Sequence, residues 1–259
     1  MRVKNKVILV TGSTTGIGEA IARLVVREGA QVMVHGLEEE LAKQICHDLG
    51  DAAAYAIADI GDPENCAKVV QATVERFGRI DVVVNNAALT TRSNLETTDA
   101  AMFDRIISVN LRAPILILRE AVKHFRAQGG GTVLNIGSVN SLGGQPDLLA
   151  YSASKAGIVN LTRNLANALA TEKIRVNLFN PGWVTTPNEI ALQQRLGMPV
   201  GWEKNVPKVY APSGRLLIPE EVARHALFWI SDESAPASGV VYELEQYSHI
   251  GRNPQKTLD

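Results

Sequence analysis

The chain has 259 residues, of which 46% are hydrophobic and 20% charged, with 26 basic and 27 acidic side chains. This balance argues against a general nucleic-acid or anionic-membrane binder, and no apolar run approaches the roughly 18 residues that a membrane helix needs. The two cysteines form no metal or redox motif, and the five histidines lack zinc-ligand spacing. We therefore expect a cytoplasmic protein with reduced thiols, no metal site, and neither nucleic acid nor membrane as partner.

Strand-like and helix-like segments alternate from end to end. Short apolar runs, typical of strands buried in a parallel sheet, are expected at 7–10, 32–34, 54–58, 81–84, 132–136, 175–179 and 240–244. Helical spacing is expected at 18–28, 39–49, 63–77, 99–126 and 150–171. This alternation predicts an α/β fold, a doubly wound parallel β-sheet of Rossmann type, as a single domain over 1–259. Such a sheet binds ligands beyond the carboxyl ends of its strands.

One stretch, about 183–217, breaks the alternation and is rich in proline and glycine. A segment this long between regular elements is usually either a binding loop or disordered. Its aromatic residues Trp183, Trp202 and Tyr210 could anchor it, which favours an ordered lid over the substrate. A tail of mixed polarity, about 245–259, follows the last predicted strand.

A glycine-rich turn, Thr11-Gly12-Ser13-Thr14-Thr15-Gly16-Ile17-Gly18, follows the first strand and opens directly into a helix. Glycines let the backbone approach a pyrophosphate closely, and the helix N-terminus offers free N–H groups and a positive dipole end. Glycine clusters alone are often plain turns between a strand and a helix. Here the strand–turn–helix context favours a phosphate site.

These glycines, together with motifs further along, make the chain resemble the classical short-chain dehydrogenase/reductase family over nearly its whole length. The matching motifs are Thr11-Gly12…Gly16-Ile17-Gly18, Asn85-Asn86-Ala87-Ala88, Asn110, Ser138, Tyr151-x-x-x-Lys155 and Pro181-Gly182…Thr186. Ala88 is a departure, because Gly is commoner there. The resemblance implies an NAD(P)-dependent oxidoreductase acting on the CH–OH group of its donor.

A catalytic set of Asn110, Ser138, Tyr151 and Lys155 follows from this resemblance. Tyr151 and Lys155 are four residues apart, so a helix projects them from one face. To act as a base, a tyrosine must have its pKa of about 10 lowered by roughly three units. We expect the Lys155 ammonium and the positive nicotinamide ring to supply this. The resemblance implies that Ser138 binds the substrate oxygen and that the Asn110 carbonyl holds a relay water. Pro114 has no N–H, so this carbonyl lacks its usual helix hydrogen bond. Alternatively, Pro114 only kinks the helix for packing.

The predicted cofactor is NAD rather than NADP. After the second strand the chain reads Val34-His35-Gly36-Leu37-Glu38-Glu39-Glu40, without the Asp that NAD-dependent relatives often carry at Gly36 or the Arg of many NADP-dependent ones at Leu37. A 2′-phosphate would lack a guanidinium partner and would face the glutamates. Asp59 is the expected adenine contact, or else a loop or helix-capping residue. The predicted cofactor contacts are Gly12, Thr14, Gly16, Ile17, Gly18, Leu37, Asp59, Ile60, Asn86, Ala87, Tyr151, Lys155, Pro181, Gly182, Val184 and Thr186.

The expected reaction is reversible hydride transfer between the cofactor and a secondary alcohol or sugar hemiacetal. Polar side chains in the lid favour a small polar substrate, with Arg92, Asn140 and Trp183 as candidate contacts; Arg92 could equally be an exposed loop residue. One alternative is a 3-oxoacyl-thioester (acyl carrier protein) reductase that uses NADPH. Another is a dinucleotide-binding sensor or scaffold without turnover, against which the intact catalytic set argues.

Self-association as a homo-oligomer is also expected. The segments 99–126 and 150–171 carry more apolar residues than one buried stripe requires, and a second copy could cover the surplus across a two-fold axis. On the second segment, Val159, Ala166 and Ala170 extend the apolar surface around the helix. The resemblance implies a tetramer, with a second two-fold interface made by the last helix and strand. Coverage by loops or by the lid of the same chain is the alternative.

Overall fold

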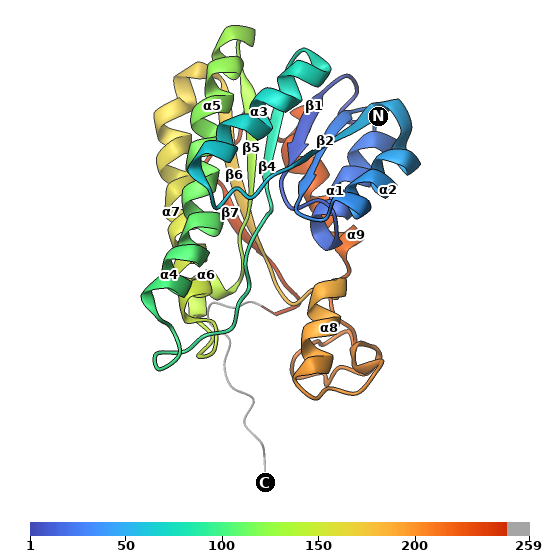
Figure 1. Cartoon of the computed structure of the whole chain (residues 1–259), viewed down its shortest axis with the longest axis vertical. Coiled ribbons are helices and arrows are strands. Elements are labelled where there is room, and N and C mark those ends of the chain that lie inside the picture. The colour runs from blue at the N-terminus through green and yellow to red at the C-terminus, as the bar shows by residue number, and fades with distance from the viewer. Residues whose placement is uncertain (248–259) are drawn as a thin grey trace.

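The middle layer of the molecule is one parallel sheet with the strand order β3-β2-β1-β4-β5-β6-β7 (Figure 1). The structure is a computed structural model and describes residues 1–247. The strands are β1 Val7–Val10, β2 Gln31–Gly36, β3 Ala53–Ile57, β4 Val82–Asn85, β5 Gly131–Ile136, β6 Ile174–Pro181 and β7 Val241–Leu244. The chain builds outward from β1 in one direction and then returns to build in the other. This confirms the predicted doubly wound α/β architecture.

Helices cover both faces of the sheet (Figure 1). One face carries α1 Gly16–Arg27, α2 Glu39–Leu49 and α9 Pro219–Ile230; the other carries α3 Pro63–Phe77, α5 Ala113–Gln128 and α7 Leu149–Leu169. Side chains alternate across each strand, so Ile8 and Val10 pack under the first set whereas Leu9 packs under the second. No helix within residues 1–247 is long and apolar enough to cross a membrane.

The helix expected over 99–126 is interrupted. Helix α4 covers Ala100–Ile107, a π-helical turn covers Ser108–Arg112, and α5 begins at Ala113. Pro114 therefore lies in the first turn of α5, where its missing N–H is least costly. Because π-helical turns are frequent at functional sites, the position of Asn110 within this one directs attention to its side chain.

The segment 183–217 contains helix α8 Pro187–Arg195 and a small cluster of buried side chains of its own. Trp202 is buried there and stacks on Trp183 with ring centroids 5.2 Å apart. The beginning of the predicted tail packs on the same segment, where Gln246 Nε2 donates to the Arg215 carbonyl at 2.7 Å. The rest of that tail, 248–259, lies outside the described residues.

Candidate active site

The predicted motifs meet at the carboxyl edge of the sheet, where the strand order reverses. The glycine turn follows β1, Asn86 and Ala87 follow β4, and Ser138 follows β5. Pro181 ends β6, and the Gly182 N–H donates to the Leu244 carbonyl at 2.8 Å. Doubly wound sheets bind ligands in this crevice.

The glycine turn is held by the strand beside it. Gly12 has a φ of +61°, and a Cβ there would lie 2.7 Å from the Cα of Ala87, so only glycine fits. The Asn86 Nδ2 donates to the carbonyls of Thr11 and Gly12, both at 2.9 Å. Gly18, in the first turn of the helix that follows, lies so close to the Gly12 carbonyl that a side chain there would collide with it.

The N-terminus of α1 faces the same crevice. Its N-cap residue is Thr15, and within the described chain the Thr15 side chain accepts no hydrogen bond from the first turn, which leaves those N–H groups for an anion. A Cβ on Gly16 would lie 3.2 Å from Thr186 Cγ2, so the segment after β6 closes over the turn. Ile17 packs on the core behind it. This cradle fits the pyrophosphate of a dinucleotide.

The end of β2 carries an acidic residue that was not among the predicted contacts. The Thr14 hydroxyl donates to Glu38 Oε2 at 2.7 Å, and the Leu37 N–H reaches the same oxygen at 3.2 Å. The bond from Thr14 is the main reason that the pKa of Glu38 is lowered. A Cβ on Gly36 would lie 2.5 Å from Thr14 Oγ1, so the threonine occupies the space that a side chain at position 36 would need. Leu37 itself is 56% exposed.

Asp59 stabilises the loop after β3. Its carboxylate accepts the Gly61 N–H at 2.8 Å and pairs with Arg105 at 2.9 Å. The hydrogen bond from Arg105 is the main reason that its pKa is lowered. Ile60 is buried beside it. The loop role left open for Asp59 is thus observed, and the adenine role stays a prediction.

Ser138, Tyr151 and Lys155 converge at the centre of the site. Helix α7 presents Tyr151 toward Ser138, to which it hydrogen bonds. The Lys155 Nζ lies 5.7 Å from the centre of the Tyr151 ring and donates to the Ile136 carbonyl at 2.7 Å. Asn140, the first residue of α6 Asn140–Gly143, donates its N–H to Ser138 Oγ at 3.2 Å.

Burial is the main influence on the protonation of Tyr151 and Lys155. Burial raises the pKa of Tyr151, the hydrogen bond with Ser138 opposes this rise, and the Glu189 carboxylate adds to it. Burial also lowers the pKa of Lys155 to about 8. Among the groups of the chain itself, removal from water is thus the largest influence on the Tyr151 pKa. The lowering expected from Lys155 together with the nicotinamide ring stays a prediction. As it stands, Tyr151 is a neutral phenol and a proton donor.

Two asparagines hold this group in place. Asn110 Nδ2 donates to Ser154 Oγ at 3.0 Å, and its Oδ1 accepts the Leu89 N–H at 2.8 Å, which ties α7 to the segment after β4. Asn180, which sequence analysis missed, accepts the Ser138 N–H on its Oδ1 at 2.9 Å and is fully buried. Its position directly before Pro181-Gly182 was the available signal.

Comparison with known proteins agrees with this geometry. A model of the family described as short chain dehydrogenase matches residues 6–197. The chain belongs to the short-chain dehydrogenase family. It is therefore an NAD(P)-dependent oxidoreductase that acts on CH–OH or carbonyl groups, which sets aside the sensor or scaffold alternative.

Individual relatives span almost the whole chain. A 3-oxoacyl-[acyl-carrier-protein] reductase of Thermotoga maritima is 34% identical, over 95% of this chain and 98% of its own. A 2-(S)-hydroxypropyl-CoM dehydrogenase of Xanthobacter autotrophicus is also 34% identical, over 94% and 96%. The crystal structure of a 3-ketoacyl-(acyl-carrier-protein) reductase from Brucella melitensis complexed with NADH has a TM-score of 0.83 and 31% identity, over 94% and 98%. The fold and the binding of a nicotinamide dinucleotide follow from these similarities.

Two of the predicted substrate contacts, Arg92 and Trp183, lie in segments outside the sheet. Arg92 forms an ion pair with Asp147, just before α7 begins. The backbones run together there, since the Ser93 N–H donates to the Asp147 carbonyl at 2.9 Å and the Leu149 N–H donates to the Ser93 carbonyl at 2.9 Å. Arg92 therefore helps to fix the start of α7, and its guanidinium is paired with a carboxylate.

The lid contributes a carboxylate, Glu189, in the first turn of α8. Its Oε1 accepts the indole N–H of Trp183 and the side-chain amide of Gln193, both at 2.8 Å. The Trp183 backbone N–H is bound in turn by Glu245 at 3.3 Å. Val184, a predicted cofactor contact, is buried and bridges to Leu217. The Glu189 carboxylate also contributes to the raised pKa of Tyr151.

Proposed function

We propose that the protein is an NAD-dependent dehydrogenase that transfers a hydride between nicotinamide and a secondary alcohol or sugar hemiacetal. The observation that carries this proposal is the convergence of Ser138, Tyr151 and Lys155 at the sheet edge that also carries the glycine turn. A protein that only binds a dinucleotide does not need a phenol, a hydroxyl and an ammonium gathered at one point.

The bound cofactor supplies the hydride acceptor. The glycine turn and the N-terminus of α1 would hold its phosphates, and Thr186 lies where it could meet the carboxamide. Ser138 would hold the substrate oxygen against Tyr151. In carbonyl reduction Tyr151 donates its proton to that oxygen; in alcohol oxidation the phenolate takes the hydroxyl proton. Lys155, a cation behind the ring, favours the phenolate that this second direction needs.

A preference for NAD over NADP is supported by Glu38. Thr14 and Leu37 hold its carboxylate at the end of β2, where it would bond a ribose hydroxyl and repel a 2′-phosphate. We expect the ratio of kcat/KM to favour NAD, and Glu38→Gln to narrow that ratio by about tenfold. Leu37→Arg should narrow it too, by supplying a phosphate partner.

The matched control for this test is Glu40→Gln, because Glu40 is exposed and paired with Lys43 on α2. The Glu40→Gln variant should have the same preference for NAD over NADP as the unmodified protein. A preference for NADP in the unmodified protein would contradict this part of the proposal.

A neutral, hydroxyl-bearing substrate is supported by the charges around Tyr151. Glu189 would repel a carboxylate or phosphate and could accept hydrogen bonds from substrate hydroxyls. Arg92, the candidate partner for an acidic group, is held by Asp147. These contacts favour a sugar or polyol over a hydroxy acid.

A second candidate, a 3-oxoacyl-thioester reductase using NADPH, is favoured by the names of two of the relatives. A panel of aldoses, polyols and an acetoacetyl thioester, assayed with both cofactors, separates the two. Reduction of NAD by an aldose or polyol supports the proposed function. Oxidation of NADPH by the acetoacetyl thioester alone would replace it with the second candidate.

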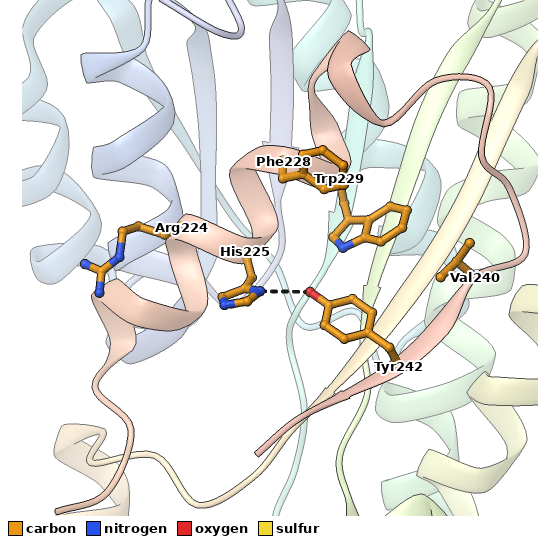
Figure 2. Close-up of a pocket in the computed structure, with 6 residues that line it drawn as sticks. All are labelled: Arg224, His225, Phe228, Trp229, Val240 and Tyr242. Carbon is orange, nitrogen blue, oxygen red and sulfur yellow. Dashed lines mark hydrogen bonds between the residues drawn. The ribbon is translucent and has the colours of Figure 1, made fainter. Parts of the chain in front are cut away.

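We further propose that the protein is a homo-oligomer, although one argument from sequence needs correction. Val159 and Ala166 do not extend the outer surface of α7, because both are buried within the chain. Support comes instead from the edge of the sheet. There α9 and β7 border an apolar hollow of about 560 Å³, lined by Arg224, His225, Phe228, Trp229, Val240 and Tyr242 (Figure 2).

A second copy is the proposed occupant, because an edge strand beside a hollow with aromatic walls suits two-fold pairing. We expect Phe228→Glu to weaken the assembly by placing charge at that surface. Sedimentation velocity at micromolar concentrations should give a species larger than one chain, and a smaller one for the variant. A monomer in the unmodified protein would refute self-association.

A further inference from the structure

His35 is a buried side chain near the end of β2 for which the reaction chemistry has no use. It is 2% exposed, and its ring spans two segments that border the cofactor site. The Gly12 N–H, in the glycine turn, donates to His35 Nδ1 at 3.3 Å. On the other side of the ring, Nε2 lies 3.0 Å from the carbonyl oxygen of Ala58, which precedes Asp59.

These two partners determine the state of the ring. A backbone N–H can only donate and a carbonyl can only accept, so Nδ1 must be bare and Nε2 must carry the proton. Burial lowers the pKa of His35 to about 4, while the nearby carboxylates of Asp59 and Glu38 act in the opposite direction. The imidazole is therefore neutral at neutral pH, in the one tautomer that satisfies both neighbours.

The backbone of His35 reinforces the contact with the turn. The Ser13 N–H donates to the His35 carbonyl at 2.7 Å, and the His35 N–H donates to Ser13 Oγ at 3.0 Å. The same hydroxyl donates to the Val10 carbonyl at 2.7 Å. Gly12 has no side chain to restrict it and has a positive φ, so its direction depends on such bonds. The His35 contacts fix the N–H side of the turn, whereas Asn86 holds the carbonyls of Thr11 and Gly12.

We propose that His35 is a positioning residue for the dinucleotide, which orders the phosphate turn by accepting the Gly12 N–H while its other ring nitrogen is anchored on the Ala58 carbonyl. A turn ordered before the ligand arrives need not be ordered on binding, which strengthens affinity. His35 would act through Gly12 and Ala58 and would touch no reacting atom. The inference depends on this edge being the dinucleotide site and not on the identity of the alcohol.

The two ends of the ring can be tested separately. In His35→Asn the side-chain Oδ1 can take the place of Nδ1 and accept the Gly12 N–H. In His35→Gln the side-chain Nε2 can take the place of the imidazole Nε2 and keep only the bond to Ala58. His35→Leu removes both, and Met33→Leu is a volume-matched control at a buried position on the same strand.

The readout is the dissociation constant of NADH by fluorescence titration, with the melting temperature of each variant measured alongside. We expect the Leu and Gln variants to bind NADH about tenfold more weakly, since Gly12 loses its acceptor. The Asn variant and the Met33 control should bind within about threefold of the unmodified protein. The Asn variant should bind NADH more tightly than the Gln variant even if the two variants have the same melting temperature.

Equal affinity in the Asn and Gln variants would overturn the proposal, and this comparison stands even if the Leu variant does not fold. Undiminished binding by a folded Leu variant would overturn it as well. If the unmodified protein did not bind NADH at all, the assignment of the dinucleotide site itself would be wrong. That result is distinguishable from one in which only the role of His35 is wrong.

Discussion

Replacing Tyr151 with Phe is expected to lower turnover by roughly 10²–10⁴-fold, the usual contribution of a general acid–base group. The substitution removes one oxygen and leaves the ring, its place on α7 and the nearby Lys155 ammonium unchanged. Affinity for NADH should therefore remain nearly the same. Steady-state kinetics and a binding titration on one preparation measure both quantities.

Tyr55→Phe provides the matched control, because Tyr55 lies on β3 and is partly exposed. It should keep full turnover. If the Tyr151 variant kept its activity, the proton would have to be transferred by another group, and the assignment of Tyr151 would be wrong.

Replacing Lys155 with Ala is expected to damage both turnover and cofactor binding. Lys155 is 3% exposed, its Nζ donates to the Ile136 carbonyl, and it is the cation behind the Tyr151 ring. Its loss removes the positive charge that favours the phenolate, and the family resemblance also places this ammonium beside the ribose hydroxyls. We expect kcat to fall about 10²-fold and the NADH dissociation constant to rise about tenfold.

The same substitution leaves the Ile136 carbonyl without its partner and opens a cavity, so stability must be measured separately. Lys155→Met keeps most of the volume without the charge and should show the same kinetic losses with a smaller change in melting temperature. A Met variant with normal turnover would show that the charge is not needed.

Most of the fold could be predicted from sequence because its signals are local. Each strand is a short apolar run, and the segments that form α1 to α5 and α7 have a helical spacing, so the alternating order could be predicted without tertiary contacts. Helices α8 and α9 were not predicted. The glycine turn was readable for the same reason, since strand, turn and helix adjoin in the chain. Pro114 marked the break in the long helix, but not that a π-helical turn would absorb it.

The parts that sequence could not supply depend on contacts between distant residues. Three consecutive glutamates lie shortly after β2. The hydrogen bond from the Thr14 hydroxyl determines that Glu38 is the one directed toward the glycine turn. Val159 looks like outer surface on a helical projection, yet it is buried against neighbouring elements. The raised pKa of Tyr151 results from burial and from Glu189 on the lid. None of these has a local signature.

The pH dependence of kcat/KM in both reaction directions tests the proton-transfer role of Tyr151 most directly. Because its pKa is raised, alcohol oxidation needs a minor phenolate, whereas carbonyl reduction uses the phenol that is already present. The kcat/KM for oxidation should therefore increase by up to about tenfold per pH unit across the neutral and alkaline range. The kcat/KM for reduction should stay level with rising pH and then fall. Oxidation that does not change between about pH 6 and pH 9, in an otherwise active preparation, would contradict the assignment.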